Sequence, residues 1–137
     1  MRLAKTFRTS LDVRWTDCDL VGHVNNAKYI EFAQDGRIRF FDGAGITFDA
    51  DNSLVVRHLV TDFERPLFLT SGPIIVEISI LKIGNSSFTI RHAIFDKQDQ
   101  RAAVVDAVLV GFDTATNTSK PLSAEVRAVL DEYLNEG

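Results

Sequence analysis

The chain has 137 residues, of which 45% are hydrophobic and 25% are charged, and this predicts one domain, residues 1–137, with a single hydrophobic core. Its net charge of -4 argues against nucleic-acid binding, because surfaces that bind phosphates are usually basic. The single cysteine excludes an internal disulfide, and the sequence has neither a signal peptide nor an apolar run long enough to span a membrane, so we expect a cytoplasmic protein.

The first part of the chain predicts a strand, a long turn and a helix. Apolar side chains alternate toward the end of Phe7 to Trp15, which predicts the first strand. The polar segment from Thr16 to Asn25 predicts an ordered turn, with Asn25 or Asn26 as the cap of the following helix. This helix is predicted to be buried because apolar side chains recur at helical steps up to Gly43 and Gly45, among them Tyr29, Ile30, Ala33, Phe40, Phe41 and Ala44.

The second part of the chain changes to a period of two, which is typical of strands. Four strands are predicted, at Ser53 to Phe63, Ile74 to Ile83, Ser86 to Phe95 and Ala102 to Phe112. Helical spacing then predicts a short helix from Ala124 to Leu134, with Ser123 as its cap. Because the strands follow one another after a single helix, the order predicts the α+β class, with a five-stranded antiparallel sheet wrapped around a long central helix.

The densest group of reactive side chains lies in the turn before the first helix. Two carboxylates, an imidazole and two amides surround Gly22 there, namely Asp17, Asp19, His23, Asn25 and Asn26. The start of a helix offers unpaired backbone N–H groups and a partial positive charge, which stabilise a carboxylate or a developing oxyanion. This turn is therefore the predicted site of chemistry.

The spacing of ligands argues against a metal in this turn. If Asp17 is position one of a calcium loop, Val21 stands at position five and Lys28 at position twelve, where oxygen ligands are required. Asp17, Asp19 and His23 are candidates for a transition-metal site, but no fourth ligand accompanies them. We expect no metal.

The run from Trp15 to Tyr29 reads WTDCDLVGHVNNAKY. It resembles the Asp-x-Asp-x-x-Gly-His-Val-Asn-Asn-x-x-Tyr signature of hotdog-fold acyl-CoA thioesterases, especially the group that includes 4-hydroxybenzoyl-CoA thioesterase. The segments from Asp62 to Leu67 and from Ile83 to Ser87 are also similar to this family. One departure is Ser71-Gly72-Pro73, where such proteins often have Gly-Asp before the next strand.

The resemblance implies a hotdog fold, homodimers whose sheets join edge to edge, active sites between subunits, and pairing of dimers into homotetramers. It implies an acyl-CoA substrate, so that coenzyme A belongs to the substrate and neither a separate cofactor nor a metal is expected. Acyl carrier protein is an alternative handle, because it carries the same pantetheine arm. Carried onto this sequence, Asp17 corresponds to the catalytic carboxylate and the backbone N–H of Val24 to the oxyanion donor.

The side chains of the turn have both catalytic and structural interpretations. Three roles are open for Asp17: a general base that activates water, a nucleophile that forms a mixed anhydride, or a structural residue that only accepts backbone hydrogen bonds. Asp19 is expected to brace the turn. The predicted substrate-binding residues are His23, Asn25, Asn26 and Tyr29. The structural alternatives are a structural histidine for His23, helix capping for Asn25 or Asn26, and core packing for Tyr29.

Several further polar residues receive weaker predictions. Glu31 and Asp35 are expected to be surface or interface charges. Cys18 is expected to be a buried thiol, because no neighbouring group activates it. Four basic residues are candidates for contacts with the phosphates of coenzyme A, and none is selected because basic side chains on strands are usually solvated: Arg57, Arg65, Lys82 and Arg91.

The leading prediction is an acyl-CoA thioesterase, a hydrolase that releases the free acid and coenzyme A. A dehydratase of the same fold is disfavoured, because such relatives carry their histidine in a motif with proline, and no proline lies near His23. The alternative is a non-hydrolytic acyl-thioester-binding protein or an interaction subunit, since a fold alone does not establish catalysis. The phenylalanines do not distinguish an aromatic from an aliphatic acyl group.

Overall fold

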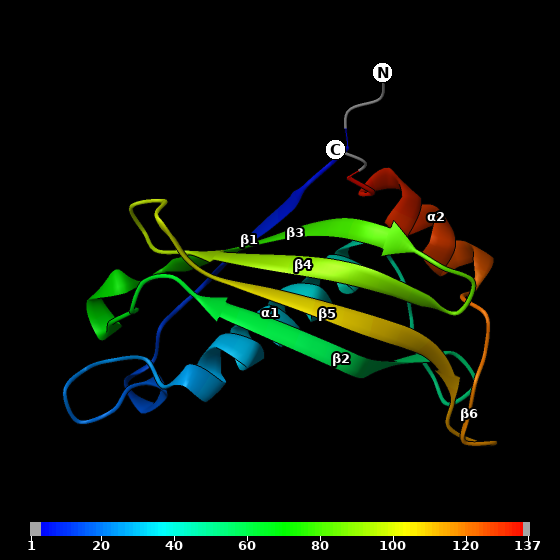
Figure 1. The fold of residues 1–137 in the computed structure, drawn as a ribbon, viewed down its shortest axis with the longest axis horizontal. Coiled ribbons are helices and arrows are strands. Elements are labelled where there is room, and N and C mark those ends of the chain that lie inside the picture. Colours follow the sequence, from blue (N-terminus) through cyan, green and yellow to red (C-terminus); the bar gives the residue numbers. More distant parts are fainter. Residues whose placement is uncertain (1–3, 136–137) are drawn as a thin grey trace.

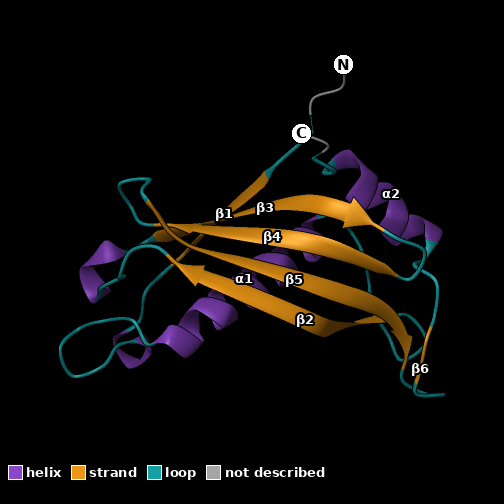
Figure 2. Ribbon diagram, viewed as in Figure 1, coloured by secondary structure: helices purple, strands orange, loops and turns teal. Residues whose placement is uncertain are grey.

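The computed structural model describes residues 4–135, which form an antiparallel sheet and two helices (Figure 1 and Figure 2). The strand order is β1-β3-β4-β5-β2, and β6 pairs with β5. The elements are β1 (Phe7–Leu11), α1 (Asn26–Gly43), β2 (Ser53–Phe63), β3 (Ile74–Ile83), β4 (Ser87–Phe95), β5 (Arg101–Asp113), β6 (Thr118–Ser119) and α2 (Ala124–Glu132). The predicted α+β order is confirmed.

Two strands differ markedly from the sequence predictions, whereas β4 and β5 differ from their predicted bounds by at most one residue at each end. The first strand was predicted to reach Trp15, but β1 ends at Leu11 because Leu11 pairs with Ile74, the first residue of β3, and no partner strand extends further. Trp15–Asp17 instead form the short 3-10 turn η1. The expected five-stranded sheet has a sixth strand, β6, whose two residues are too few to produce a periodic sequence pattern.

Helix α1 lies across one face of the curved sheet (Figure 1) and packs mainly against β3 and β4. Its buried face includes Phe32, Gly36 and Phe40. A Cβ atom at Gly36 would lie 2.6 Å from Cγ1 of Val76, so glycine permits the close approach of α1 to β3. The opposite face exposes Ile38, which means that the predicted burial of the helix is confirmed for one face.

Both helices begin at the predicted caps. The side chain of Asn25 accepts a hydrogen bond from the N–H of Ala27 at 3.0 Å, and Ser123 accepts one from Val126 at 3.2 Å. Helix α2 packs against β3 and ends at Glu132, two residues before the predicted end. Within residues 4–135, neither helix combines the length and the apolar character that a membrane span requires.

Candidate active site

Asp17 is a buried carboxylate held by Arg14, and its side chain is 1% exposed. Its Oδ2 accepts a hydrogen bond from the backbone N–H of Arg14 at 2.8 Å, and its Oδ1 accepts one from the guanidinium Nη2 of Arg14 at 3.0 Å. The η1 turn brings the two residues together, because the N–H of Asp17 donates back to the carbonyl oxygen of Arg14 at 2.9 Å. Arg14 therefore fixes the orientation of the carboxylate.

The environment of Asp17 keeps it ionised. Burial is the largest single influence on the pKa of Asp17 and raises it, because a poorly solvated site disfavours the charged form. The side-chain and backbone hydrogen bonds from Arg14 and its positive charge act in the opposite direction, with a smaller effect from Lys28. The net result is a pKa below the ordinary value. An ionised carboxylate is the state that a general base or a nucleophile requires.

Asp19 braces the turn, as predicted. Its Oδ1 accepts hydrogen bonds from the N–H groups of Val21 and His23, both at 3.0 Å. Its own N–H donates to the carbonyl oxygen of His23 at 2.8 Å, and Gly22 closes the turn with a φ of 83°. One carboxylate oxygen of Asp19 is thus engaged with the backbone of its own turn.

The backbone of Leu67 ties the turn to the first turn of α1. Its N–H donates to the phenol oxygen of Tyr29 at 2.9 Å, and its carbonyl oxygen accepts the N–H of Val24 at 2.8 Å. The ring of His23 packs edge-on against Phe68, with ring centroids 4.8 Å apart. The backbone N–H that the family resemblance assigns to the oxyanion is therefore bonded to a carbonyl oxygen of the chain itself.

Five predicted residues converge on one cavity of about 520 Å³, the His23 cavity. They are His23, Val24, Asn25, Asn26 and Tyr29, and they share the cavity with Asp19 and with residues Phe63, Glu64, Arg65 and Pro66. Of these four residues, only Arg65 had a predicted role, as one of the candidates for contacts with the phosphates of coenzyme A. The signal that marked them was the similarity of the segment from Asp62 to Leu67 to the thioesterase family.

Asp17 lines a different cavity of about 450 Å³, the Asp17 cavity. Arg14, Glu31, Gln34 and Asp35 also line it. Both helix carboxylates are exposed, as predicted, and Glu31 pairs with Lys28 at 2.9 Å. The His23 cavity is lined by Asn26, the first residue of α1, and the Asp17 cavity by Glu31 on the same helix. The carbonyl oxygen of Asp17 accepts the N–H of Asn25 at 2.9 Å, which connects the Asp17 turn to the start of α1.

The start of α1 presents one backbone donor without an acceptor. The N–H of Ala27 donates to the side chain of Asn25, and the N–H of Lys28 donates to the carbonyl oxygen of Asn25. Among residues 4–135, no hydrogen-bond acceptor lies at the N–H of Asn26. The first N–H groups of a helix attract negative charge, so this donor suits an oxyanion.

Cys18 is half-buried and not fully buried as predicted. Burial is the largest cause that raises the pKa of its thiol, and the charges of Asp17 and Asp19 raise it further, so the thiol is a poor nucleophile. In the part of the chain that the structure describes, no three His, Cys, Asp or Glu side chains are grouped closely enough to hold a metal ion. The absence of a metal stays a prediction.

The four basic candidates for phosphate contacts lie in different settings. Arg65 lines the His23 cavity. Arg91 donates two hydrogen bonds of 2.8 Å to the carboxylate of Asp106, so its guanidinium is already paired. Arg57 and Lys82 are exposed on the strands. Of the four, only Arg65 adjoins the predicted site residues.

The chain resembles solved structures that are named as thioesterases or predicted thioesterases. It is similar to a predicted thioesterase from Bacillus stearothermophilus, with 25% identity, a TM-score of 0.83, and coverage of 97% of this chain and 99% of that chain. It is similar to a thioesterase complexed with coenzyme A and Zn from Thermus thermophilus, with 27% identity, a TM-score of 0.74 and coverage of 90% of each chain.

A third similar structure shares only the fold. It is a 1,4-dihydroxy-2-naphthoyl-CoA thioesterase from Synechocystis, with 16% identity, a TM-score of 0.82, and coverage of 93% of this chain and 96% of that chain. No curated protein matches the sequence. These similarities confirm the hotdog fold and support thioester hydrolysis in general terms. Because the sequence matches the family over residues 13–130, the chain belongs to the Thioesterase-like superfamily.

Proposed function

We propose that this protein hydrolyses acyl-CoA thioesters and that Asp17 is its general base or nucleophile. The observation that carries the proposal is that Asp17 is the one buried carboxylate among residues 4–135, and its pKa lies below the ordinary value. As a base it activates water, and as a nucleophile it forms a mixed anhydride with the acyl group. Either role requires the charged form that Arg14 stabilises.

The thioester is proposed to lie across the start of α1, with the Asp17 cavity on one side and the His23 cavity on the other. The N–H of Asn26 is the first oxyanion donor in this arrangement, because it has no acceptor in the described part of the chain. Val24, the donor implied by the resemblance, contributes when its N–H exchanges the oxygen of Leu67 for the oxyanion. Backbone donors aimed at developing charge are effective catalytic groups.

The His23 cavity is proposed to hold the pantetheine arm. The amide side chains of Asn25 and Asn26 and the imidazole of His23 line it and provide donors and acceptors for the arm's amides. Arg65, at the same cavity, is suited to a phosphate of coenzyme A. The thioesterase of Thermus thermophilus was solved with coenzyme A, which supports this ligand class. Acyl carrier protein would present the same arm.

Strand β2 is the proposed dimer contact. It lies at one edge of the sheet and exposes Val55, Val56, Val60 and Phe63. An apolar edge strand with unpaired backbone groups is a template for pairing with a second copy. Sedimentation analysis is expected to give a homodimer or a homotetramer, and a monomeric mass at assay concentrations would contradict this contact.

The test is hydrolysis of a panel of short, long and aromatic acyl-CoAs by the wild type and by Asp17→Asn. Loss of the base is expected to lower kcat by about 10²- to 10⁴-fold, whereas Asp51→Asn, an exposed loop carboxylate outside both cavities, is expected to retain activity. Equal rates for wild type and Asp17→Asn would remove Asp17 from the mechanism.

A second measurement separates hydrolysis from binding alone. Calorimetry of the same acyl-CoA panel gives the affinity of the wild type for each thioester. Tight binding without turnover across the panel would replace the hydrolase with the alternative, a non-hydrolytic acyl-thioester-binding protein. Turnover of an acyl-carrier-protein thioester in preference to the matched CoA thioester would identify the carrier protein as the handle.

A further inference from the structure

A third cavity, of about 470 Å³, lies between the second half of α1 and the first half of β2. We name it the Arg37 groove, after the one basic residue in its lining. Most of the lining is apolar, and the residues that matter below are Arg37, Ile38, Phe41, Phe48, Leu54 and Val56. Ile38 and Val56 are exposed in the single chain, and Val56 also belongs to the proposed dimer contact on β2.

A buried histidine orients the guanidinium of Arg37. Nδ1 of His92 donates to the carbonyl oxygen of Val105 at 2.8 Å, because a carbonyl oxygen only accepts. Nε2 of the neutral ring then carries the lone pair, and it accepts a hydrogen bond from Nη1 of Arg37 at 3.1 Å. Burial is the largest cause that lowers the pKa of His92, to about 4. At neutral pH the ring positions Arg37 without neutralising its charge.

Arg37 has no carboxylate partner in the described part of the chain. Within residues 4–135, no carboxylate oxygen lies within 4.0 Å of its guanidinium. Asp42 lines the same groove, but it is exposed and forms no ion pair with Arg37. Arg37 is half-buried, and burial lowers its pKa. A poorly solvated guanidinium without a counter-ion favours a ligand that brings a carboxylate.

The Arg37 groove lies further along α1 than the His23 cavity. The His23 cavity is lined by Tyr29 of α1 and by Phe63, the last residue of β2, whereas the Arg37 groove is lined by later residues of α1 and earlier residues of β2. Helix α1 packs chiefly against β3, β4, β1 and β5, and the Arg37 groove lies between α1 and β2. Arg37 follows Tyr29 by eight residues, about 12 Å along the helix axis.

We propose that the Arg37 groove receives the distal part of the acyl chain and that Arg37 binds a carboxylate at its far end. The substrate class is then the CoA thioesters of medium-chain dicarboxylic acids. This inference rests on the proposed thioesterase function. The apolar wall contacts the methylene chain, and the guanidinium pairs with the distal carboxylate, so chain length and end charge are selected together.

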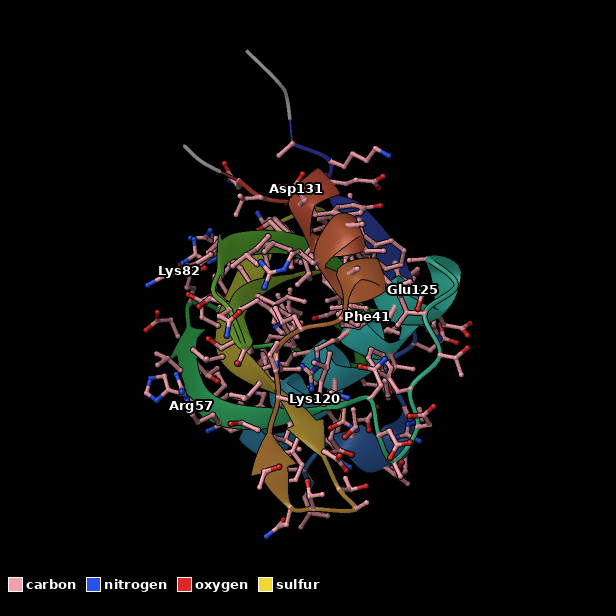
Figure 3. All side chains as sticks on the ribbon, turned by 90° about the vertical axis from the view of Figure 1, so that its right-hand side faces the viewer. Phe41, Arg57, Lys82, Lys120, Glu125 and Asp131 are labelled. Carbon is pink, nitrogen blue, oxygen red and sulfur yellow. The ribbon has the colours of Figure 1, made fainter. Side chains whose placement is uncertain are left out.

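Figure 3 faces the end of the molecule to which the groove belongs. Phe41, from the wall of the groove, lies toward the centre of the molecule, whereas Arg57 of β2 points outward. Arg57 carries the same charge as Arg37 and lies on β2, the strand that contributes to the groove, but it does not line the groove. It therefore provides the matched control for a substitution of Arg37.

The experiment compares kcat/KM for three CoA thioesters of the same chain length: that of the dicarboxylic acid, that of its distal methyl ester and that of the corresponding fatty acid. The comparison is made at each of three lengths, with eight, ten and twelve carbons. For the wild type we expect the dicarboxylic thioester to exceed the other two by about tenfold or more at one of these lengths, as a charge-assisted hydrogen bond provides. Arg37→Met is expected to lower this ratio to about one, mainly through KM, Arg37→Lys to retain part of it, and Arg57→Met to retain all of it.

The outcomes separate the two proposals. Hydrolysis of fatty acyl-CoAs by the wild type without preference for any dicarboxylic thioester would overturn the inference and leave the proposed function intact, even if the Arg37 variants fail to fold. A ratio that survives in Arg37→Met would also overturn it. A monomeric Arg37→Met together with no preference in the wild type would assign the groove to a second copy of the chain. No turnover of any thioester would overturn both proposals.

Discussion

The phenol oxygen of Tyr29 accepts a hydrogen bond from the backbone N–H of Leu67 at 2.9 Å. Tyr29 is 2% exposed, so this bond is made away from solvent. The carbonyl oxygen of the same Leu67 accepts the N–H of Val24. Leu67, four residues after the end of β2, thereby holds the first turn of α1 and the turn that contains Asp17 in a fixed relation, although neither contact is close in the sequence.

Tyr29→Phe is expected to destabilise the fold by about 1–3 kcal/mol, because it leaves the N–H of Leu67 buried without an acceptor. Urea unfolding gives the free energy of unfolding. Tyr133→Phe is the control, because within residues 4–135 the hydroxyl of Tyr133 has no hydrogen-bond partner and its ring keeps its edge-on contact with Phe40. Equal losses in the two variants would contradict the importance of the Tyr29 bond.

Gly36→Ala is expected to destabilise the protein in spite of the higher helix propensity of alanine. The added Cβ would lie 2.6 Å from Cγ1 of Val76, and the overpacking penalty of about 1–3 kcal/mol outweighs a propensity gain of up to about 1 kcal/mol. Gly43→Ala, where nothing lies within 4 Å of the new Cβ, is expected to be neutral or stabilising. Thermal unfolding of both variants measures the contrast, and a stabilised Gly36→Ala would disprove the close contact.

The sequence predicted the parts of the fold that repeat regularly. The alternation along β3 and β4 and the helical spacing after Asn26 placed these elements within about two residues, because local geometry sets their periods. The turn around Gly22 was predictable because its residue types brace the backbone over short distances. The resemblance to thioesterases then connected the turn to a chemistry.

The remaining features depend on contacts between distant parts of the chain. Arg37 and His92 are 55 positions apart, and only the packing of α1 on β4 brings them within 3.1 Å. The separation of Asp17 from the His23 cavity also depends on how the turn folds back on itself, which side-chain spacing does not encode. Neither the Arg37 groove nor the engagement of the Val24 N–H had a local signal in the sequence.

Arg14→Gln is expected to move the acid limb of the kcat/KM profile to higher pH. Burial raises the pKa of Asp17, and the side-chain hydrogen bond of Arg14 is the largest cause that lowers it. Arg14→Gln removes the guanidinium hydrogen bonds and the charge and keeps only the backbone hydrogen bond of residue 14, so the pKa of Asp17 is expected to rise. The carboxylate then takes up a proton at a pH where the wild type is still active. Arg14→Lys, which keeps the charge, is expected to shift the limb less.

The control for this profile is Arg39→Gln. Arg39 lines the Asp17 cavity but donates its hydrogen bonds to Thr9 and to the carbonyl oxygen of Ser10. Its replacement is expected to leave the position of the acid limb unchanged. A limb at the same pH in Arg14→Gln and in the wild type would show that another group sets the acid dependence of the reaction.

His92 is expected to make the fold less stable as the pH falls from 6.5 to about 4. The folded protein keeps the buried ring neutral down to about pH 4, whereas the unfolded chain takes up a proton below about pH 6.5, so acid favours unfolding in this window and the effect levels off below it. The total loss is about 3 kcal/mol. Burial is the main cause, and the nearby charge of Arg37 opposes protonation further.

Urea unfolding of the wild type and His92→Gln across this pH range tests the effect. Glutamine does not titrate, and its side-chain oxygen offers Arg37 an acceptor, so the variant is expected to lose less stability between pH 6.5 and pH 4. The difference between the two slopes is informative even if the variant is less stable at every pH, because a constant offset cancels. Parallel curves for the two proteins would mean that His92 changes its protonation in the folded state as readily as in the unfolded chain.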